Sequence, residues 1–212
     1  SIKKNRIIFK KYNNFRIIYN GINIKKIKLK KINSRSKICL MLSTYENRKG
    51  HKFLFDVFKK VVKKIKDAKL LVYGDNQHDE KLNLIKYKNL LGLKRNIILN
   101  DYSNNNLSLI KNSKIVVVPS RSHESFGYTI IEAMSQKRPV IASNVGGIGE
   151  VLKNSKAGYL ISKNNSDLFS KKIIQILKNK NLQKKLGQNG YDHCKLYFTS
   201  KKMSKNYYKL IV

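Results

Sequence analysis

Two carboxylates stand eight residues apart in a chain that has few acids. Glu124 and Glu132 both lie in the segment 119–134, and only 12 of the 212 residues are Asp or Glu. Carboxylates accept hydrogen bonds from vicinal hydroxyls, so such a pair suits a ribose and a second sugar. A capping acid and a partly buried salt bridge would give the same spacing, and the spacing alone leaves both interpretations open. Gly127, where the next helix is expected to begin, leaves backbone N–H groups open to a ligand.

A second candidate site is basic. Arg48, Lys49 and Gly50 directly precede a run with helical periodicity. Two cations and a glycine at a helix entrance suit a diphosphate, because the charges pair with its oxygens and glycine lets the backbone come close. The alternative is a solvated loop in a Lys-rich protein. The phosphate-binding loop of NTPases is excluded, since the pattern GxxxxGK[ST] does not occur.

A third candidate is the glycine-rich turn that contains Gly146 and Gly147. A dinucleotide-binding fingerprint, GxGxxG, read from Gly147 would need glycine where Leu152 stands, so the turn fails as a cofactor motif. It still suits close approach of the backbone to an anion or a sugar.

The elements that must position these residues alternate between apolar strands and amphipathic helices. Such alternation predicts one α/β domain with a doubly wound, parallel, Rossmann-like sheet, whose ligands sit at the carboxyl ends of the strands. Strands are expected at 38–42, 70–73, 96–99, 115–118, 140–142 and 159–161, with a further strand-like run at 15–19. Helices are expected at 53–65, 79–91, 107–110, 128–135, 148–152, 169–177 and 180–196, and near the C-terminus. Ser166 or Asp167 should cap the helix at 169–177, and Thr199 or Ser200 the last.

The charge of the chain is a weak guide to its function. Lys and Arg number 46, and the formal net charge is +34. Lys, Asn and Ile, which dominate the composition, have AT-rich codons, so nucleotide bias explains it without a ligand. A nucleic-acid-binding protein more often concentrates its charge on one face and favours Arg. Lys is instead spread over nearly every segment, which argues against nucleic-acid binding as the main role and leaves attraction to anionic lipid as a side effect.

Other features exclude further classes of protein. No run of 18 apolar residues occurs, so no transmembrane helix is expected. Cys39 and Cys194 form no disulfide framework, which favours a reducing compartment, and both are expected to be inert core residues. His123 is expected to be an exposed loop residue rather than a catalytic one.

Four segments together resemble a known family. The segment 124–134 resembles the E-x7-E element of the retaining glycosyltransferases of the GT4 type, which have the GT-B fold. The segment 18–22 resembles the "YNGID" that leads into the second domain of this family. The segments 48–51 and 145–150 resemble its "KG" loop and its "GGIPE" turn. The resemblance covers essentially the whole chain and implies the C-terminal, nucleotide-sugar-binding half of such an enzyme.

The resemblance also implies roles for individual residues. The diphosphate of the donor would be bound by Lys49, with help from Arg48 and Gly50. The hydroxyls of the transferred sugar would be held by the catalytic Glu124 and by the backbone of Phe126 and Gly127, and the ribose by Glu132. The turn at Gly146 and Gly147 would lie near the donor, and the base beside the loops after Tyr73 and Leu99.

The implied reaction is transfer of a sugar from a nucleoside-diphosphate sugar to an acceptor glycan or lipid-linked glycan, with retention of configuration. No metal and no cofactor beyond the donor are expected. The expected setting is polysaccharide or lipopolysaccharide biosynthesis in the cytoplasm, with peripheral association with the inner face of the membrane. In domain terms, 1–36 would lead in from a missing N-terminal acceptor domain, 37–196 would bind the donor, and the helix in 197–212 would pack on the missing domain.

Three departures and two alternatives accompany this interpretation. Ser43 stands where the family usually has an Arg that grips the diphosphate, Gly149 replaces a Pro, and Asn100 and Asp101 replace a common Gly. One alternative is a non-catalytic or split-subunit nucleotide-sugar-binding module. The other is a basic nucleic-acid-binding protein.

Overall fold

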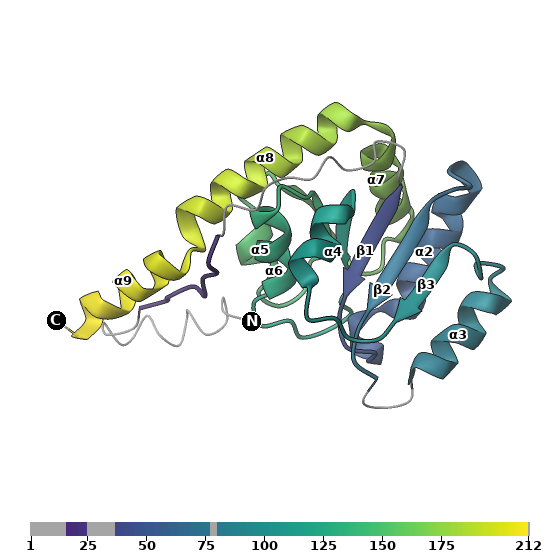
Figure 1. The fold of residues 1–212 in the computed structure, drawn as a ribbon, viewed down its shortest axis with the longest axis horizontal. Coiled ribbons are helices and arrows are strands. Elements are labelled where there is room, and N and C mark those ends of the chain that lie inside the picture. Colours follow the sequence, from purple (N-terminus) through teal and green to yellow (C-terminus); the bar gives the residue numbers. More distant parts are fainter. Residues whose placement is uncertain (1–15, 25–36, 77–79, 212) are drawn as a thin grey trace.

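A six-stranded parallel sheet forms the centre of the molecule (Figure 1). The computed structural model describes residues 16–24, 37–76 and 80–211. Across the sheet the strands follow the order β3-β2-β1-β4-β5-β6. Their bounds are β1 Ile38–Leu42, β2 Lys69–Tyr73, β3 Ile97–Asn100, β4 Ile115–Val118, β5 Val140–Ser143 and β6 Gly158–Ile161.

The order of the strands reverses between β1 and β4. Strand β1 pairs in parallel with β2 on one side and with β4 on the other. The chain first builds outward from β1 through β2 to β3 and then returns to build β4, β5 and β6. Loops that leave two neighbouring strands in opposite directions open a crevice at the carboxyl edge, where doubly wound sheets bind their ligands.

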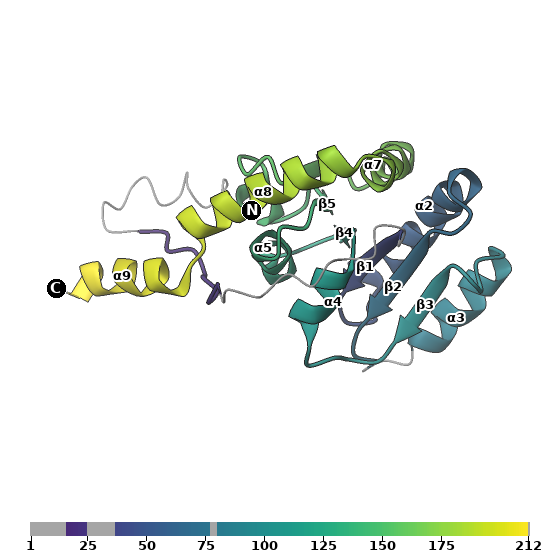
Figure 2. The ribbon, with the colours of Figure 1, turned by 45° about the horizontal axis from the view of Figure 1, so that its top comes forward.

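Helices cover both faces of the sheet (Figure 2). In β1, Cys39 and Met41 belong to one buried cluster and Leu40 to the other, because successive side chains point to opposite faces. The first cluster contains side chains of α2 (His51–Lys64), α3 (Glu80–Leu90) and α7 (Ser166–Lys178). The second contains side chains of α4 (Asn106–Asn112), α5 (Tyr128–Ser135), α6 (Ile148–Leu152) and α8 (Lys180–Tyr197). The 3₁₀ turn η1 (Asn47–Lys49) precedes α2, and α9 (Ser200–Ile211) ends the chain.

The predicted fold class is confirmed, with two local corrections. The prediction of a strand at 15–19 is wrong for residues 16–19, which form no strand. In the same described segment, Ile22 makes an isolated bridge to Thr199. Phe15 lies outside the described residues. The cap of α7 is Asn165, whose side chain accepts a hydrogen bond from the Leu168 N–H, and not Ser166 or Asp167.

The other local predictions agree with the structure. Thr199 caps α9, because its hydroxyl oxygen accepts a hydrogen bond from the Lys202 N–H at 3.1 Å. Cys39 and Cys194 are buried, and burial raises the pKa of both thiols. Within the described ranges, each helix is too short or too polar to cross a membrane.

Candidate functional site

The loops after β1 and β4 are hydrogen-bonded to each other at the carboxyl edge of the sheet. The Arg121 N–H donates to the Arg48 carbonyl at 2.7 Å. Gly50, between η1 and α2, has a left-handed backbone with φ of 82°. A Cβ at Gly50 would lie 2.1 Å from the Pro119 carbonyl oxygen, so both the conformation and the space require glycine there. The close backbone approach that Gly50 allows is therefore to the neighbouring loop.

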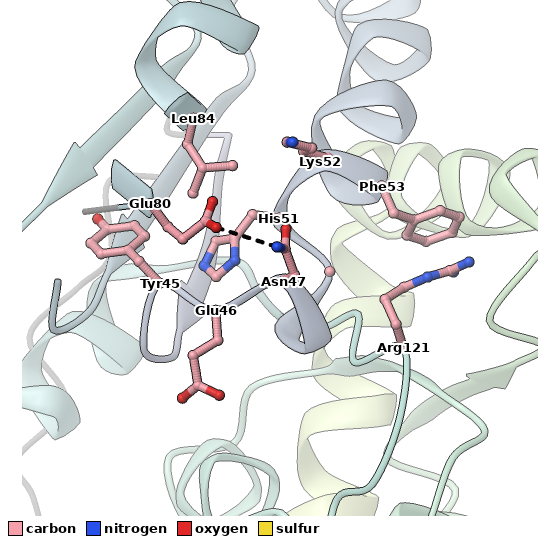
Figure 3. Close-up of a pocket in the computed structure, with 10 residues that line it drawn as sticks. Tyr45, Glu46, Asn47, His51, Lys52, Phe53, Glu80, Leu84 and Arg121 are labelled. Atoms are coloured by element: carbon pink, nitrogen blue, oxygen red, sulfur yellow. Dashed lines mark hydrogen bonds between the residues drawn. The ribbon is translucent and has the colours of Figure 1, made fainter. Parts of the chain in front are cut away.

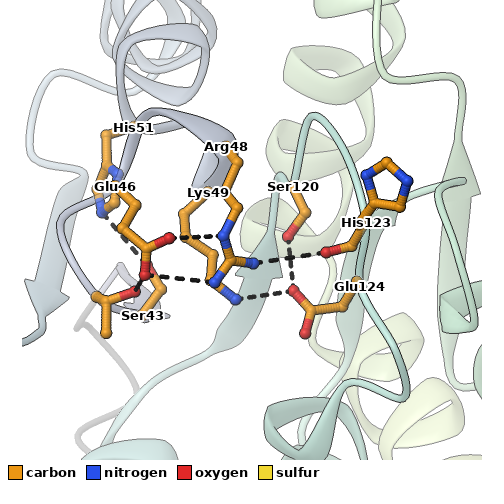
Figure 4. A network of polar contacts seen from close by, with 9 residues as sticks. Ser43, Glu46, Arg48, Lys49, His51, Ser120, His123 and Glu124 are labelled. Carbon is orange, nitrogen blue, oxygen red and sulfur yellow. Dashed lines mark hydrogen bonds and ion pairs between the residues drawn. The ribbon is translucent and has the colours of Figure 1, made fainter.

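This contact brings Lys49 and Glu124 together, although they are 75 residues apart in the sequence (Figure 4). The Lys49 Nζ donates to the Glu124 Oε2 at 2.9 Å, and the side chains are only 15% and 17% exposed. The buried Ser120 also donates to the same oxygen, at 3.2 Å. The residues predicted for the diphosphate and for the donor sugar thus form one half-buried ion pair.

Arg48 lies at the outer side of this pair and faces two acceptors. Its Nε donates to the Glu46 Oε2 at 2.6 Å and its Nη1 to the carbonyl of His123 at 3.5 Å. The Thr44 hydroxyl, and after it Arg48, hold the pKa of the Glu46 carboxyl below its ordinary value. The His123 side chain is exposed, as predicted.

The glycine-rich turn after β5 supports the loop that carries Glu124. The Gly147 N–H donates to the Glu124 carbonyl at 2.7 Å. Gly146 has φ of 53°, and a Cβ there would lie 2.2 Å from the same carbonyl oxygen. On the other side of the site, a Cβ at Gly74 after β2 would clash in the same way with the Ser43 carbonyl oxygen. The loops after β2, β1, β4 and β5 thus touch one another in sheet order, and we refer to them as the loop row.

Two adjoining hollows open along the loop row. The first is lined by Lys49, Ser120, Glu124 and Gly127, among others. The second lies over the ends of β2 and β3, where Gly74, Asp75, Tyr102, Ser103 and Asn106 line it. Leu42, Ser43 and Thr129 line both hollows, so the two adjoin at the first turn of α5.

Glu132 lies one helical turn after Thr129 on α5. Residues three apart share a face of a helix, so Glu132 lies on the same side of α5 as Thr129. Its side chain is half-buried, and burial raises the pKa of the carboxyl above its ordinary value. Within the described part of the chain, this carboxylate has no hydrogen-bond or ion-pair partner.

Phe126 and Gly127 complete the loop that leads into α5. Gly127 precedes α5 with φ of 86° and no side-chain cap, so the first turn of the helix keeps unpaired N–H groups. The Phe126 ring packs against Tyr19 and Phe198, at centroid distances of 6.4 and 5.8 Å. Tyr19 belongs to the segment that resembles "YNGID", which runs along the junction of α8 and α9, where Ile22 exchanges two backbone hydrogen bonds with Phe198 and Ser200.

Three residues of the site were missed from the sequence. Ser120 contacts Glu124, Thr129 lines both hollows, and His51 is buried behind Ser43, with its Nε2 3.3 Å from the Ser43 Oγ. Burial lowers the pKa of His51 to about 4, so the ring is neutral at pH 7. The place of Ser120, directly after the proline that follows the strand at 115–118, is a signal that could have identified it.

A separate hollow lies on the other side of the loop after β1 (Figure 3). Glu80 at the start of α3 accepts a hydrogen bond from the Asn47 amide at 3.3 Å. The Arg121 guanidinium lies over the Phe53 ring, 4.4 Å from its centroid. The same guanidinium also bonds to the Lys163 carbonyl and to Asn164. These contacts hold the loops after β1 and β4 on the side opposite the Lys49–Glu124 pair.

Comparison with known proteins assigns the family. The sequence pattern described as "Glycosyl transferases group 1" matches residues 23–193. This chain belongs to that glycosyltransferase family. An uncharacterized glycosyltransferase of Methanocaldococcus jannaschii is 32% identical over 182 residues, which are 85% of this chain and 49% of the relative. The chain thus spans about half the length of this relative.

Solved structures agree with the family. Staphylococcus aureus TarM, a mutant in complex with fondaparinux, α-GlcNAc-glycerol and UDP, superposes with a TM-score of 0.85 at 27% identity, over 99% of this chain and 42% of TarM. The C-terminal domain of a group 1 glycosyltransferase (LpcC) from Francisella tularensis superposes with a TM-score of 0.73 at 24% identity, over 85% of this chain and all of that domain. The fold of this glycosyltransferase chain is that of a GT-B C-terminal half.

Proposed function

We propose that this chain is the donor-binding half of a retaining, GT4-type glycosyltransferase, which transfers a sugar from a nucleoside-diphosphate sugar to an acceptor glycan or lipid-linked glycan. The Lys49–Glu124 pair at the reversal of the strand order carries the proposal. It joins a cation for the diphosphate and a carboxylate for the sugar hydroxyls in one crevice. The GT-B fold and the group 1 family support the same conclusion.

In this proposal the donor lies along the loop row. Its diphosphate contacts Lys49 and Arg48 near the start of α5, where a helix N-terminus favours negative charge. The transferred sugar faces Glu124 and the backbone of Phe126 and Gly127. The nucleoside occupies the second hollow, between Gly74 and Tyr102.

The unpaired carboxylate of Glu132 fits the ribose in this arrangement. Burial raises the pKa of this carboxyl, and two vicinal hydroxyls would donate hydrogen bonds to its charged form. Glu132 shares a helix face with Thr129, which lines both hollows, and this supports its assignment to the ribose.

Catalysis would rest on charge stabilisation at the leaving diphosphate. Lys49 and the N–H groups at the start of α5 lie where negative charge grows as the glycosidic phosphate bond breaks. We propose that these groups and Arg48 neutralise the diphosphate without a metal ion, and that no cofactor beyond the donor takes part. In the whole enzyme, an acceptor-binding half would precede residues 37–196, and the reaction would take place in the cytoplasm.

Calorimetric titration with UDP, GDP and ADP at physiological salt tests the donor site. One nucleotide should bind saturably, and Glu132→Gln should weaken it by roughly tenfold or more, since hydrogen bonds to a charged group contribute about 1.5–3 kcal/mol. Asp192→Asn, on the exposed side of α8, removes the same charge far from the site and should change nothing.

Two outcomes would contradict the proposal. Equal binding of all three nucleotides, with no effect of Glu132→Gln, would leave only a basic surface that attracts phosphates. Specific binding without sugar transfer, even when an acceptor-binding half is supplied, would favour the non-catalytic module. Retention is checked by the anomeric configuration of the product, measured by NMR.

A further inference from the structure

Tyr102 is an exposed aromatic residue in the second hollow. It follows β3 by two residues and lines the hollow over the ends of β2 and β3, yet it is 65% exposed. In the described part of the chain, its ring packs on no other aromatic ring and its hydroxyl makes no hydrogen bond. The face of this ring is therefore open to a ligand that enters the hollow.

The chain directly before Tyr102 is held by two contacts. The hydroxyl of the buried Tyr45 donates to the Asn100 carbonyl at 2.6 Å. Lys81 of α3 pairs with Asp101, the next residue, at 2.5 Å. Asn100 and Asp101 are the residues that stand in place of the common Gly of the family. Because they fix the end of β3, less conformational freedom is lost when a ligand packs on the Tyr102 ring.

The second hollow suits a part of the donor that carries no phosphate. Lys and Arg number 46 in the chain, yet none is among the described residues that line this hollow, where the one charged side chain is the acid Asp75. The first hollow, in contrast, contains Lys49. Ser103 and Asn106 line the second hollow beside Tyr102, and their hydroxyl and amide groups both donate and accept hydrogen bonds.

A nucleobase matches these two kinds of surface. It has an apolar face, which stacks on an aromatic ring, and a polar edge, which forms hydrogen bonds with hydroxyl and amide groups. Tyr102 offers the ring, and Ser103 and Asn106 offer the polar groups. A phosphate would instead require cations or free N–H groups.

We propose that the Tyr102 ring stacks on the base of the donor nucleotide and so strengthens binding of the nucleoside part of the donor. This inference rests on the proposed function, because it takes the diphosphate to lie at Lys49 in the adjoining hollow. Stacking tolerates every base, since each has a π-face. Tyr102 is therefore a binding residue that raises affinity without selecting the base.

Calorimetric titration of the full chain with UDP, GDP and ADP tests the proposal. For the nucleotide that the wild type binds, Tyr102→Ala should weaken binding roughly 5- to 100-fold, as expected for the loss of one base–aromatic stack. Tyr102→Phe keeps the ring and should bind within about twofold of the wild type. The matched control is Tyr208→Ala on α9, which removes a tyrosine that is 64% exposed and should change nothing.

Two further measurements separate stacking from a general disturbance of the loop. In proton NMR, the base signals should shift upfield on binding to the wild type and to Tyr102→Phe, because the base protons lie over an aromatic ring. This shift should be lost with Tyr102→Ala. Inorganic pyrophosphate has no base and should bind equally to the wild type and to Tyr102→Ala.

Four outcomes would contradict the inference. Saturable nucleotide binding that Tyr102→Ala leaves unchanged would overturn it while the donor site stands. A loss shared by Tyr102→Phe would overturn it in favour of a hydrogen bond from the hydroxyl. Equal weakening of pyrophosphate and nucleotide binding by Tyr102→Ala would overturn it in favour of a disturbed loop. Absence of saturable binding by the wild type would refute the proposed function, and this inference with it.

Discussion

From the Lys49–Glu124 ion pair we predict that removing a carboxylate from the donor site strengthens nucleotide binding. If the donor diphosphate takes Lys49 as its partner, binding must first separate Lys49 from Glu124. Replacing Glu124 by Gln removes this competing partner and also a negative charge beside the diphosphate. The variant Glu124→Gln should therefore bind the nucleoside diphosphate more tightly than the wild type does, although Glu124 is proposed to hold the hydroxyls of the transferred sugar.

The magnitude follows from the exposure of the pair. Fully exposed pairs contribute about 0.2–1 kcal/mol, and breaking a buried pair costs about 3–5 kcal/mol. With side chains 15% and 17% exposed and a distance of 2.9 Å, the pair lies between these limits. We estimate about 1–2 kcal/mol, which corresponds to a factor of about 5–30 in affinity.

The assay is calorimetric titration with the preferred nucleoside diphosphate, on the wild type, Glu124→Gln and Lys49→Met. Lys49→Met should weaken binding by about tenfold or more, because it removes a charge-assisted contact. The corresponding nucleotide sugar should gain less from Glu124→Gln, since it loses the contact to its hydroxyls. Unchanged or weaker nucleoside diphosphate binding by Glu124→Gln would refute the reasoning.

Three further predictions concern the stability of the fold, measured by urea unfolding. Gly50→Ala should lower the free energy of unfolding by more than about 2 kcal/mol, because the new Cβ meets the Pro119 carbonyl. Gly92→Ala, at φ of 73° with nothing within 4 Å, should lower it by only about 1 kcal/mol. Equal losses would contradict the close contact between the loops after β1 and β4. His51 stays neutral in the folded state down to about pH 4, whereas in the unfolded chain it gains a proton below about pH 6.5. The free energy of unfolding should therefore fall by up to about 3 kcal/mol between these two pH values, and His51→Gln should remove most of this dependence. An unchanged pH dependence in the variant would contradict the burial of His51. Asn165→Ala should cost about 1 kcal/mol through the lost cap of α7, and a larger loss from Ser166→Ala would contradict the cap assignment.

The sequence predicted the architecture well where local pattern and tertiary packing agree. The predicted helix at 128–135 matches α5, because its apolar side and the glycine before it mark both the face and the start. The cap of α7 was placed one or two residues late, since Asn165, Ser166 and Asp167 are all good caps and only the backbone geometry selects one. The run at 15–19 has the composition of a strand, but Tyr19 packs on Phe198 near the α8–α9 junction, and residues 16–19 pair with no strand.

The candidate site was predicted as separate motifs, and their contacts were not. Lys49 and Glu124 were each assigned to a part of the donor, but only the pairing of β1 with β4 makes them partners. Gly50, Gly146 and Gly147 were assigned to the approach of a ligand, whereas in the structure they admit the backbone of a neighbouring loop. Spacing within one segment carries no information about a neighbour 75 residues away, so these contacts could not be inferred.

The loop row also limits how this protein can be changed. In each contact of the row, a glycine on one loop accommodates a carbonyl on the next, from Gly74 at Ser43 through Gly50 at Pro119 to Gly146 at Glu124. A loop grafted alone from another glycosyltransferase must therefore bring a backbone that fits the retained neighbours. Exchange of donor specificity between relatives should succeed more often when the loops after β1, β4 and β5 are transplanted as one block than when any of them is moved singly.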